Sequence, residues 1–183
     1  MMNTLKRTRR FLVPVILGSA LTATAMPAFA SSGEAALNQP RRGPVEIVNA
    51  QTGKCLTIAG GRSTENNVVA VQFDCDDDRS RTWRLRESRR GYQIMNRQTR
   101  KCLTIAGGRS TENNVRALQF DCDNDRSRYW SIYRSGRGTY KIRNKQTGKC
   151  LTIAGGRSTE NNVEALQFRC DDDRSRRWLI RRA

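Results

Sequence analysis

The residue types that this chain has, and one that it lacks, limit the chemistry open to it. No histidine occurs among its 183 residues, which excludes Ser-His-Asp and Cys-His catalytic relays and imidazole metal ligands. The hydrolase mechanisms that depend on a histidine are therefore excluded. The six cysteines are disulfide partners, metal ligands or nucleophiles, and the compartment of the protein decides among these uses.

The first thirty residues have the pattern of a secretory signal. Basic residues at positions 6–10 precede an apolar stretch that begins at Phe11 and ends in small residues around Ala30. This order predicts a signal peptide over residues 1–30 and a secreted, extracellular protein. The alternative is a membrane anchor, but Pro14 and Gly18 make a poor spanning helix. Residues 31–44 are polar and contain two prolines and two arginines, which predicts a flexible leader.

The chain is strongly basic. It has 34 Lys and Arg against 17 Asp and Glu, a net charge of +17, and signal cleavage would remove four basic residues and leave +13. Arginine dominates, and it grips sulfate, phosphate or carboxylate with paired hydrogen bonds. One hypothesis is thus a binder of anionic polymers, such as sulfated or uronic glycans or cell-wall phosphate polymers. Nucleic acid would be held only nonspecifically, and solubility alone is an equally simple reason for the charge.

A block of fifteen residues occurs three times without change. The sequence KCLTIAGGRSTENNV occupies residues 54–68, 101–115 and 149–163. Around each copy, β-branched and aromatic residues alternate with turn residues every eight to twelve positions, which predicts four short strands per unit. No stretch has a sustained helical period. The sequence therefore predicts an all-β domain over residues 45–183, with repeats at 45–91, 92–139 and 140–183.

Each repeat contains two cysteines that are twenty positions apart. Six cysteines allow many pairings, but the internal symmetry favours one bridge per repeat. The predicted disulfides are Cys55 with Cys75, Cys102 with Cys122, and Cys150 with Cys170. Each should stabilise an exported domain by about 3 kcal/mol in the chain-entropy model. The competing interpretation, a zinc thiolate site, lacks the short ligand spacing of structural zinc sites.

All three tryptophans stand in an Arg-x-Trp tripeptide, once per repeat. We predict that Trp83, Trp130 and Trp178 lie in the core near a pseudo-threefold axis, since burying each ring is worth a few kcal/mol. The alternative, a ligand platform, would need polar partners beside each ring, and the sequence indicates none.

These motifs together resemble the ricin B-type lectin family. The resemblance covers residues 45–182 and rests on Cys-Leu, a Gly-Gly loop, an aromatic two residues before the second cysteine, and a closing tripeptide like Gln-x-Trp. It implies a pseudo-threefold symmetric β-trefoil with three repeats of four strands. It also implies a carbohydrate-binding protein, a lectin, with up to three equivalent shallow sites for glycans or polysaccharides and with neither cofactor nor metal.

In this family each sugar site combines an acidic residue after Cys-Leu, a stacking aromatic and a polar pair before the last tryptophan. This chain has threonine at the acidic position and Ser-Arg at the polar pair, so galactose specificity is not carried over. A threonine offers one uncharged oxygen where a carboxylate accepts two strong hydrogen bonds. The predicted carbohydrate-binding residues are Thr57, Phe73 and Ser80, then Thr104, Phe120 and Ser127, and then Thr152, Phe168 and Ser175.

An acidic run follows each second cysteine, at residues 76–78, 123–125 and 171–173. One interpretation is a solvated turn, and another is a substitute for the missing carboxylate. Calcium is a third, although the runs lack the glycine and distal glutamate of an EF-hand loop. In the repeated block, Asn66 and Asn67 could cap the loop or bind hydroxyl groups.

No pair of acids is placed across a cleft, so we do not predict an enzyme. A trefoil-fold interaction or inhibitor protein is a further alternative, but three identical loops argue against one specialised inhibitory loop. The residue before the second cysteine is Asp74, Asp121 or Arg169, which predicts unequal sugar sites. Because histidine is absent, we expect binding that varies little between about pH 6 and pH 8.

Overall fold

The computed structural model describes residues 43–183. The predicted signal peptide and the predicted leader up to residue 42 lie outside the described residues. Between residues 43 and 183, no helix has the length and apolar character needed to cross a membrane.

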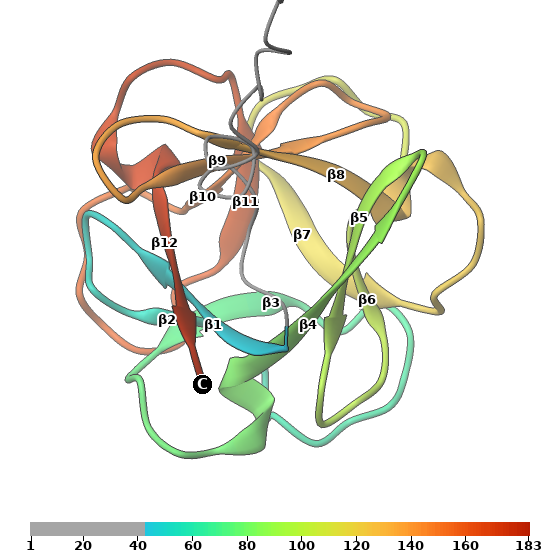
Figure 1. Ribbon diagram of the computed structural model, residues 1–183, viewed down its shortest axis with the longest axis horizontal. Helices are drawn as coiled ribbons and strands as arrows, with labels where there is room; N and C mark the ends of the chain where they lie inside the picture. The colour runs from blue at the N-terminus through green and yellow to red at the C-terminus, as the bar shows by residue number, and fades with distance from the viewer. Residues whose placement is uncertain (1–42) are drawn as a thin grey trace, which may run out of the picture. The chain divides into compact units, whose positions relative to one another are not determined.

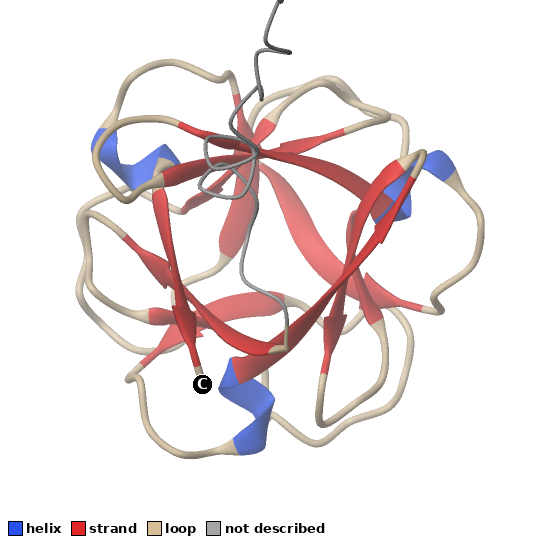
Figure 2. Cartoon of the chain, viewed as in Figure 1, coloured by secondary structure: helices blue, strands red, loops and turns tan. Residues whose placement is uncertain are grey.

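Four strands and one short 3-10 helix make up each repeat (Figure 2). The first repeat contains β1 (Pro44–Asn49), β2 (Cys55–Ile58), β3 (Ala70–Phe73), η1 (Arg79–Arg81) and β4 (Thr82–Ser88). The second contains β5 (Gly91–Asn96), β6 (Cys102–Ile105), β7 (Val115–Phe120), η2 (Arg126–Arg128) and β8 (Tyr129–Arg134). The third contains β9 (Tyr140–Asn144), β10 (Cys150–Ile153), β11 (Ala165–Phe168), η3 (Arg174–Arg176) and β12 (Trp178–Arg182).

The first and last strands of every repeat pair in a closed ring. β1 pairs with β4, β4 with β5, β5 with β8, β8 with β9, β9 with β12, and β12 with β1, all antiparallel. This ring is a six-stranded barrel without a free edge. The remaining strands form the hairpins β2–β3, β6–β7 and β10–β11, and the three repeats lie around a common axis (Figure 1). The arrangement is a β-trefoil, as the sequence predicted.

The three tryptophans lie in the core, fully buried. Each indole N–H donates, at 2.8–3.0 Å, to the backbone carbonyl of the leucine in the strand that begins with the first cysteine of its own repeat. Trp83 thereby joins barrel strand β4 to hairpin strand β2 through the carbonyl of Leu56. A buried indole keeps its donor satisfied in this way, so the ring packs in the core and also fixes the hairpin on the barrel.

Three disulfides join the hairpins to the loops that follow them. Cys55 is bonded to Cys75, Cys102 to Cys122, and Cys150 to Cys170. The predicted pairing within each repeat is confirmed. Each bridge ties the start of the acidic run of its repeat to the first residue of the Cys-Leu-Thr-Ile strand.

The repeated loops hold neighbouring repeats together. The side-chain amide of Gln119, in the second repeat, donates to the carbonyls of Ser63 and Glu65 in the loop of the first, at 2.8 and 2.7 Å. Gln167 holds the loop of the second repeat in the same way, and Gln72 holds that of the third. The three contacts therefore form a closed cycle around the axis.

The asparagines of this loop have a structural role between repeats. The amide of Asn66 donates to the carboxylate of Asp121 in the second repeat at 2.8 Å. The equivalent Asn161 donates to Asp74 of the first repeat at 2.7 Å. Asn67 has a positive φ of 68°, which asparagine tolerates better than most residues. Its backbone N–H donates to the carbonyl of Gln119 at 2.9 Å, so the pair serves the junction between repeats.

Replacing Gln119 with alanine should destabilise the fold without touching a pocket. Two loop carbonyls would lose their donor, which costs about 2 kcal/mol. Denaturant unfolding of Gln119→Ala should show this loss as a lower midpoint with an unchanged slope. The exposed Gln98→Ala is the matched control and should unfold like the wild type. Equal midpoints for the two variants would show that the loop is held by other contacts.

Candidate functional site

A shallow pocket lies at the same place in each repeat. The pockets have volumes of about 240, 340 and 550 Å³ in the first, second and third repeats. Each is lined by the threonine of the Cys-Leu-Thr-Ile strand, the Gly-Gly-Arg loop, the phenylalanine before the second cysteine, the last aspartate of the acidic run, and the arginine of the Arg-x-Trp tripeptide. The structure therefore brings each predicted threonine and phenylalanine together.

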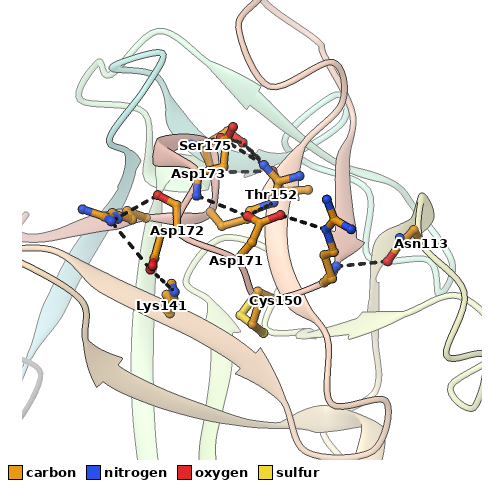
Figure 3. Close-up of polar contacts among 12 residues, drawn as sticks. Asn113, Lys141, Cys150, Thr152, Asp171, Asp172, Asp173 and Ser175 are labelled. Atoms are coloured by element: carbon orange, nitrogen blue, oxygen red, sulfur yellow. Dashed lines mark hydrogen bonds and ion pairs between the residues drawn. A yellow bond between two sulfur atoms is a disulfide. The ribbon is translucent and has the colours of Figure 1, made fainter.

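The threonine and serine of each site are buried at its base, where Ser127 and Ser175 line their pockets but Ser80 lies beneath the lining of the first. Thr57 is only 2% exposed and Ser80 only 1%, and the Thr57 hydroxyl donates to the carbonyl and to Oγ of Ser80 at 3.0 and 3.2 Å. The same bonds occur between Thr104 and Ser127. Thr152 and Ser175 repeat them (Figure 3). These hydroxyls are bonded to one another, so they support the pocket from below.

A glycine lets the loop approach the base of the pocket. Gly61 has a positive φ of 69°, and a Cβ there would lie 3.0 Å from the hydroxyl oxygen of Ser80. Any larger residue would meet both a strained backbone and a steric clash. The second glycine of the repeated block is therefore required by the pocket.

The last aspartate of each acidic run forms one wall. Oδ1 of Asp78 accepts from the backbone N–H of Ser80 at 2.8 Å, which caps η1. This bond, together with the Ser80 hydroxyl and the positive charges of Arg81 and Arg62, holds the pKa of Asp78 below its usual value of 3.8. The pocket therefore carries an ionised carboxylate throughout the physiological range.

The other two repeats reproduce this wall. Asp125 and Asp173 cap η2 and η3 through Ser127 and Ser175, with N···O distances of 2.9 and 2.8 Å. The serine hydroxyls donate to the same carboxylates at 2.6 and 2.7 Å. These bonds lower the pKa of both aspartates. The acidic run is thus both a turn and the source of a carboxylate in each pocket.

An arginine covers part of each phenylalanine. The guanidinium carbon of Arg81 lies 4.4 Å from the centroid of the Phe73 ring, and the equivalent distances in the other repeats are 4.3 and 4.4 Å. The guanidinium also donates to Oγ of Ser80 at 2.7 Å and lies 3.1 Å from a carboxylate oxygen of Asp76. The half-buried phenylalanine therefore shares its pocket with a fixed cation, a contact worth about 0.5–2 kcal/mol.

The third phenylalanine has a second cationic neighbour. The guanidinium of Arg169 lies 5.9 Å from the Phe168 ring centroid, and that of Arg176 lies 4.4 Å from it. Both arginines also pair with Asp171 at 3.1 Å (Figure 3). In the first two repeats the residue equivalent to Arg169 is an aspartate, Asp74 or Asp121. The three pockets therefore share one plan but differ in charge at the aromatic ring.

Two further residue sets line the pockets. The arginine of each Gly-Gly-Arg loop is exposed at the mouth, at positions 62, 109 and 157. An asparagine from another repeat completes each wall, because Asn162, Asn67 and Asn114 line the first, second and third pockets. In the sequence, only the exact repetition of the block pointed to these arginines and asparagines. The repetition does not show which repeat's pocket each loop contacts.

The closed barrel, the three hairpins and the three surface pockets define a β-trefoil domain of the lectin class. The chain belongs to the ricin-type β-trefoil lectin domain family, which matches residues 43–178. No curated protein matches the chain in sequence.

Solved structures share the fold at low sequence identity. The designed threefold symmetric protein ThreeFoil is 20% identical with a TM-score of 0.73, over 76% of this chain and 99% of that one. A ricin B-like lectin of Macrolepiota procera, solved in complex with lactose, is 14% identical with a TM-score of 0.68, over 79% and 99%. An exo-β-1,3-galactanase of Clostridium thermocellum is 23% identical with a TM-score of 0.73, over 79% of this chain but 31% of its own.

Acid should weaken the fold through the capping aspartates. Their pKa values lie below 3.8 in the folded state, so they contribute stability that is present above the unfolded pKa and is lost as pH falls through the folded value. At pH values below about 4, the melting temperature should therefore fall. A triple variant with Asp78, Asp125 and Asp173 changed to Asn should melt lower at pH 7 and lose less on acidification. A parallel fall in both proteins would assign the acid sensitivity to other carboxylates.

Proposed function

We propose that this protein is a secreted, non-enzymatic lectin that binds glycans through up to three shallow pockets built on one plan. The observation that carries the proposal is the ionised aspartate beside a half-buried phenylalanine in each pocket, repeated three times in a chain of the ricin-type lectin family. The disulfides and the signal-like segment support export to an oxidising compartment.

Each part of the pocket has a task in this proposal. The carboxylate of Asp78 accepts hydrogen bonds from two sugar hydroxyls, as the carboxylate after Cys-Leu does in the family. The free part of the Phe73 ring packs against the C–H face of the sugar. Thr57 and Ser80 position the aspartate and the arginine from below. The exposed Arg62 donates from the rim of the pocket.

Three pockets matter because a single shallow site holds a sugar weakly. They belong to three repeats around one axis (Figure 1), so a polysaccharide or a glycan-dense surface can engage more than one. Such engagement multiplies affinity by roughly 10² or more where the spacing of the sugars permits it. We therefore propose multivalent binding as the working mode of the protein.

A glycan and polysaccharide array at low and moderate salt tests the proposal. Wild-type protein should bind selected glycans at about 50 mM and at about 200 mM salt, because hydroxyl recognition is screened less than phosphate or sulfate contact. The variant with Asp78, Asp125 and Asp173 changed to Asn should lose about tenfold per site, the worth of one charge-assisted hydrogen bond.

The matched control is Asp77→Asn, in the same acidic run, whose side chain lines none of the three pockets. It should bind like the wild type. Background signal for every glycan, with a correctly folded protein, would overturn the proposal.

The pockets should contribute unequally. Phe168 has two guanidinium neighbours and Phe120 has one, so the third ring has less free surface for a sugar. Single changes to alanine at Phe73, Phe120 and Phe168, titrated with one array-selected glycan by calorimetry, should show the smallest loss for Phe168→Ala. Three equal losses would contradict this ranking.

A further inference from the structure

A fourth pocket lies outside the three sites described above. It has a volume of about 380 Å³ and is lined by Arg90, Asn124, Arg126, Tyr129 and Lys145. Arg90 comes from the β4–β5 hairpin, Lys145 follows β9, and the other three residues lie in and beside η2. Segments of all three repeats therefore meet at this pocket.

The lining carries three cations and no acid. Among residues 43–183, none of Arg90, Arg126 and Lys145 forms an ion pair. Nearby cations without counter-charges repel one another, so an anion placed between them would relieve the repulsion.

Hydrogen bonds hold the two arginines of the pocket in place and use only a small part of their donor capacity. Arg90 donates to the carbonyl of Asn124 and Arg126 donates to the carbonyl of Lys145, each at 3.1 Å. Arginine has five N–H donors, so most donors of Arg90 and Arg126 have no partner among residues 43–183. The buried ring of Tyr129 forms the floor, fixed by its hydroxyl bond to Oδ1 of Asn124 at 3.0 Å.

The equivalent places in the other repeats contain acids. The position of Asn124 is aspartate in both, Asp77 and Asp172. In the first repeat the pocket at this place is lined by Glu46, Asp76 and Asp77 along with two arginines. In the third repeat Asp172 pairs with Lys141 at 2.9 Å (Figure 3). The second repeat alone combines an uncharged residue here with three cations.

We propose that this pocket binds a sulfate or phosphate ester group carried on a sugar. Arg90 and Arg126 grip the oxygens of the anion through paired N–H groups, and Lys145 adds a point charge. The Tyr129 ring is 5% exposed and forms the floor beneath the anion, with the Arg90 guanidinium 5.9 Å from its centroid. The sugar part rests on the proposed lectin function, whereas the anion part rests on this pocket alone.

The experiment titrates the protein with glucose 6-sulfate, glucose 6-phosphate and glucose, and follows backbone amide shifts by NMR. Either ester should shift the amides of Asn124, Tyr129 and Lys145 at concentrations where glucose does not, and the stronger of the two identifies the anion. Equal shifts with glucose, or ester shifts confined to other surfaces, would overturn the proposal.

A variant with a changed charge distribution distinguishes ester binding at this pocket from nonspecific attraction by the net positive charge of the protein. Asn124→Asp restores the acid of the other repeats and should weaken ester binding about fivefold or more. The double variant Asn124→Asp with Asp77→Asn has the net charge of the wild type and should be just as weak. Unchanged affinity in the double variant would assign ester binding to net charge and refute the pocket.

Failure of the lectin proposal would look different. The change of Phe120 to alanine removes the aromatic ring of the second sugar pocket, keeps the net charge of the wild type and leaves Arg90, Arg126, Tyr129 and Lys145 in place. It should reduce binding of array-selected neutral glycans and leave ester binding unchanged. Loss of both kinds of binding in this variant would contradict the separation of the two sites.

Discussion

The structure depends on the docking of each repeat's loop on a buried glutamine of another repeat. Gln72, Gln119 and Gln167 are fully buried, and each offers both N–H donors of its amide to two carbonyls of an incoming loop. The same loops carry the Gly-Gly turn and the asparagine that line the pockets. No repeat completes its pocket alone, so the closure that stabilises the fold also builds the sites.

The sequence predicted what a single repeat encodes. Strand order, the three disulfides and the buried tryptophans all follow from residues within one unit, where alternation and spacing act locally. The sequence could not predict that Thr57 would bond to Ser80 beneath the pocket, because both positions were taken from the sugar contacts of a family in which other residue types stand there. It also could not place Asn67 in the pocket of the second repeat, because that contact crosses between repeats.

Local ion pairs hold an aspartate in each sugar pocket of this strongly basic chain, although arginines line the same pockets. Arg81 lies near Asp76 and Asp78 and over Phe73, and the other repeats copy this network. The arginine over each phenylalanine therefore has its counter-charges beside it, whereas most other arginines of residues 43–183 form no ion pair. The surface beside η2 differs because Asn124 removes one acid from an otherwise repeated pattern.

The exact repetition of the docking loop makes its three acceptor sites chemically interchangeable. A loop with the same residues meets the same glutamine amide in every repeat, so the glutamine contacts do not distinguish the correct neighbour from another repeat or from a second molecule. Exchange of loops between chains is the characteristic failure of repeated architectures. What distinguishes the correct partner is the covalent path together with the residue that meets the loop's first asparagine, which is Asp121, Asp74 or Arg169.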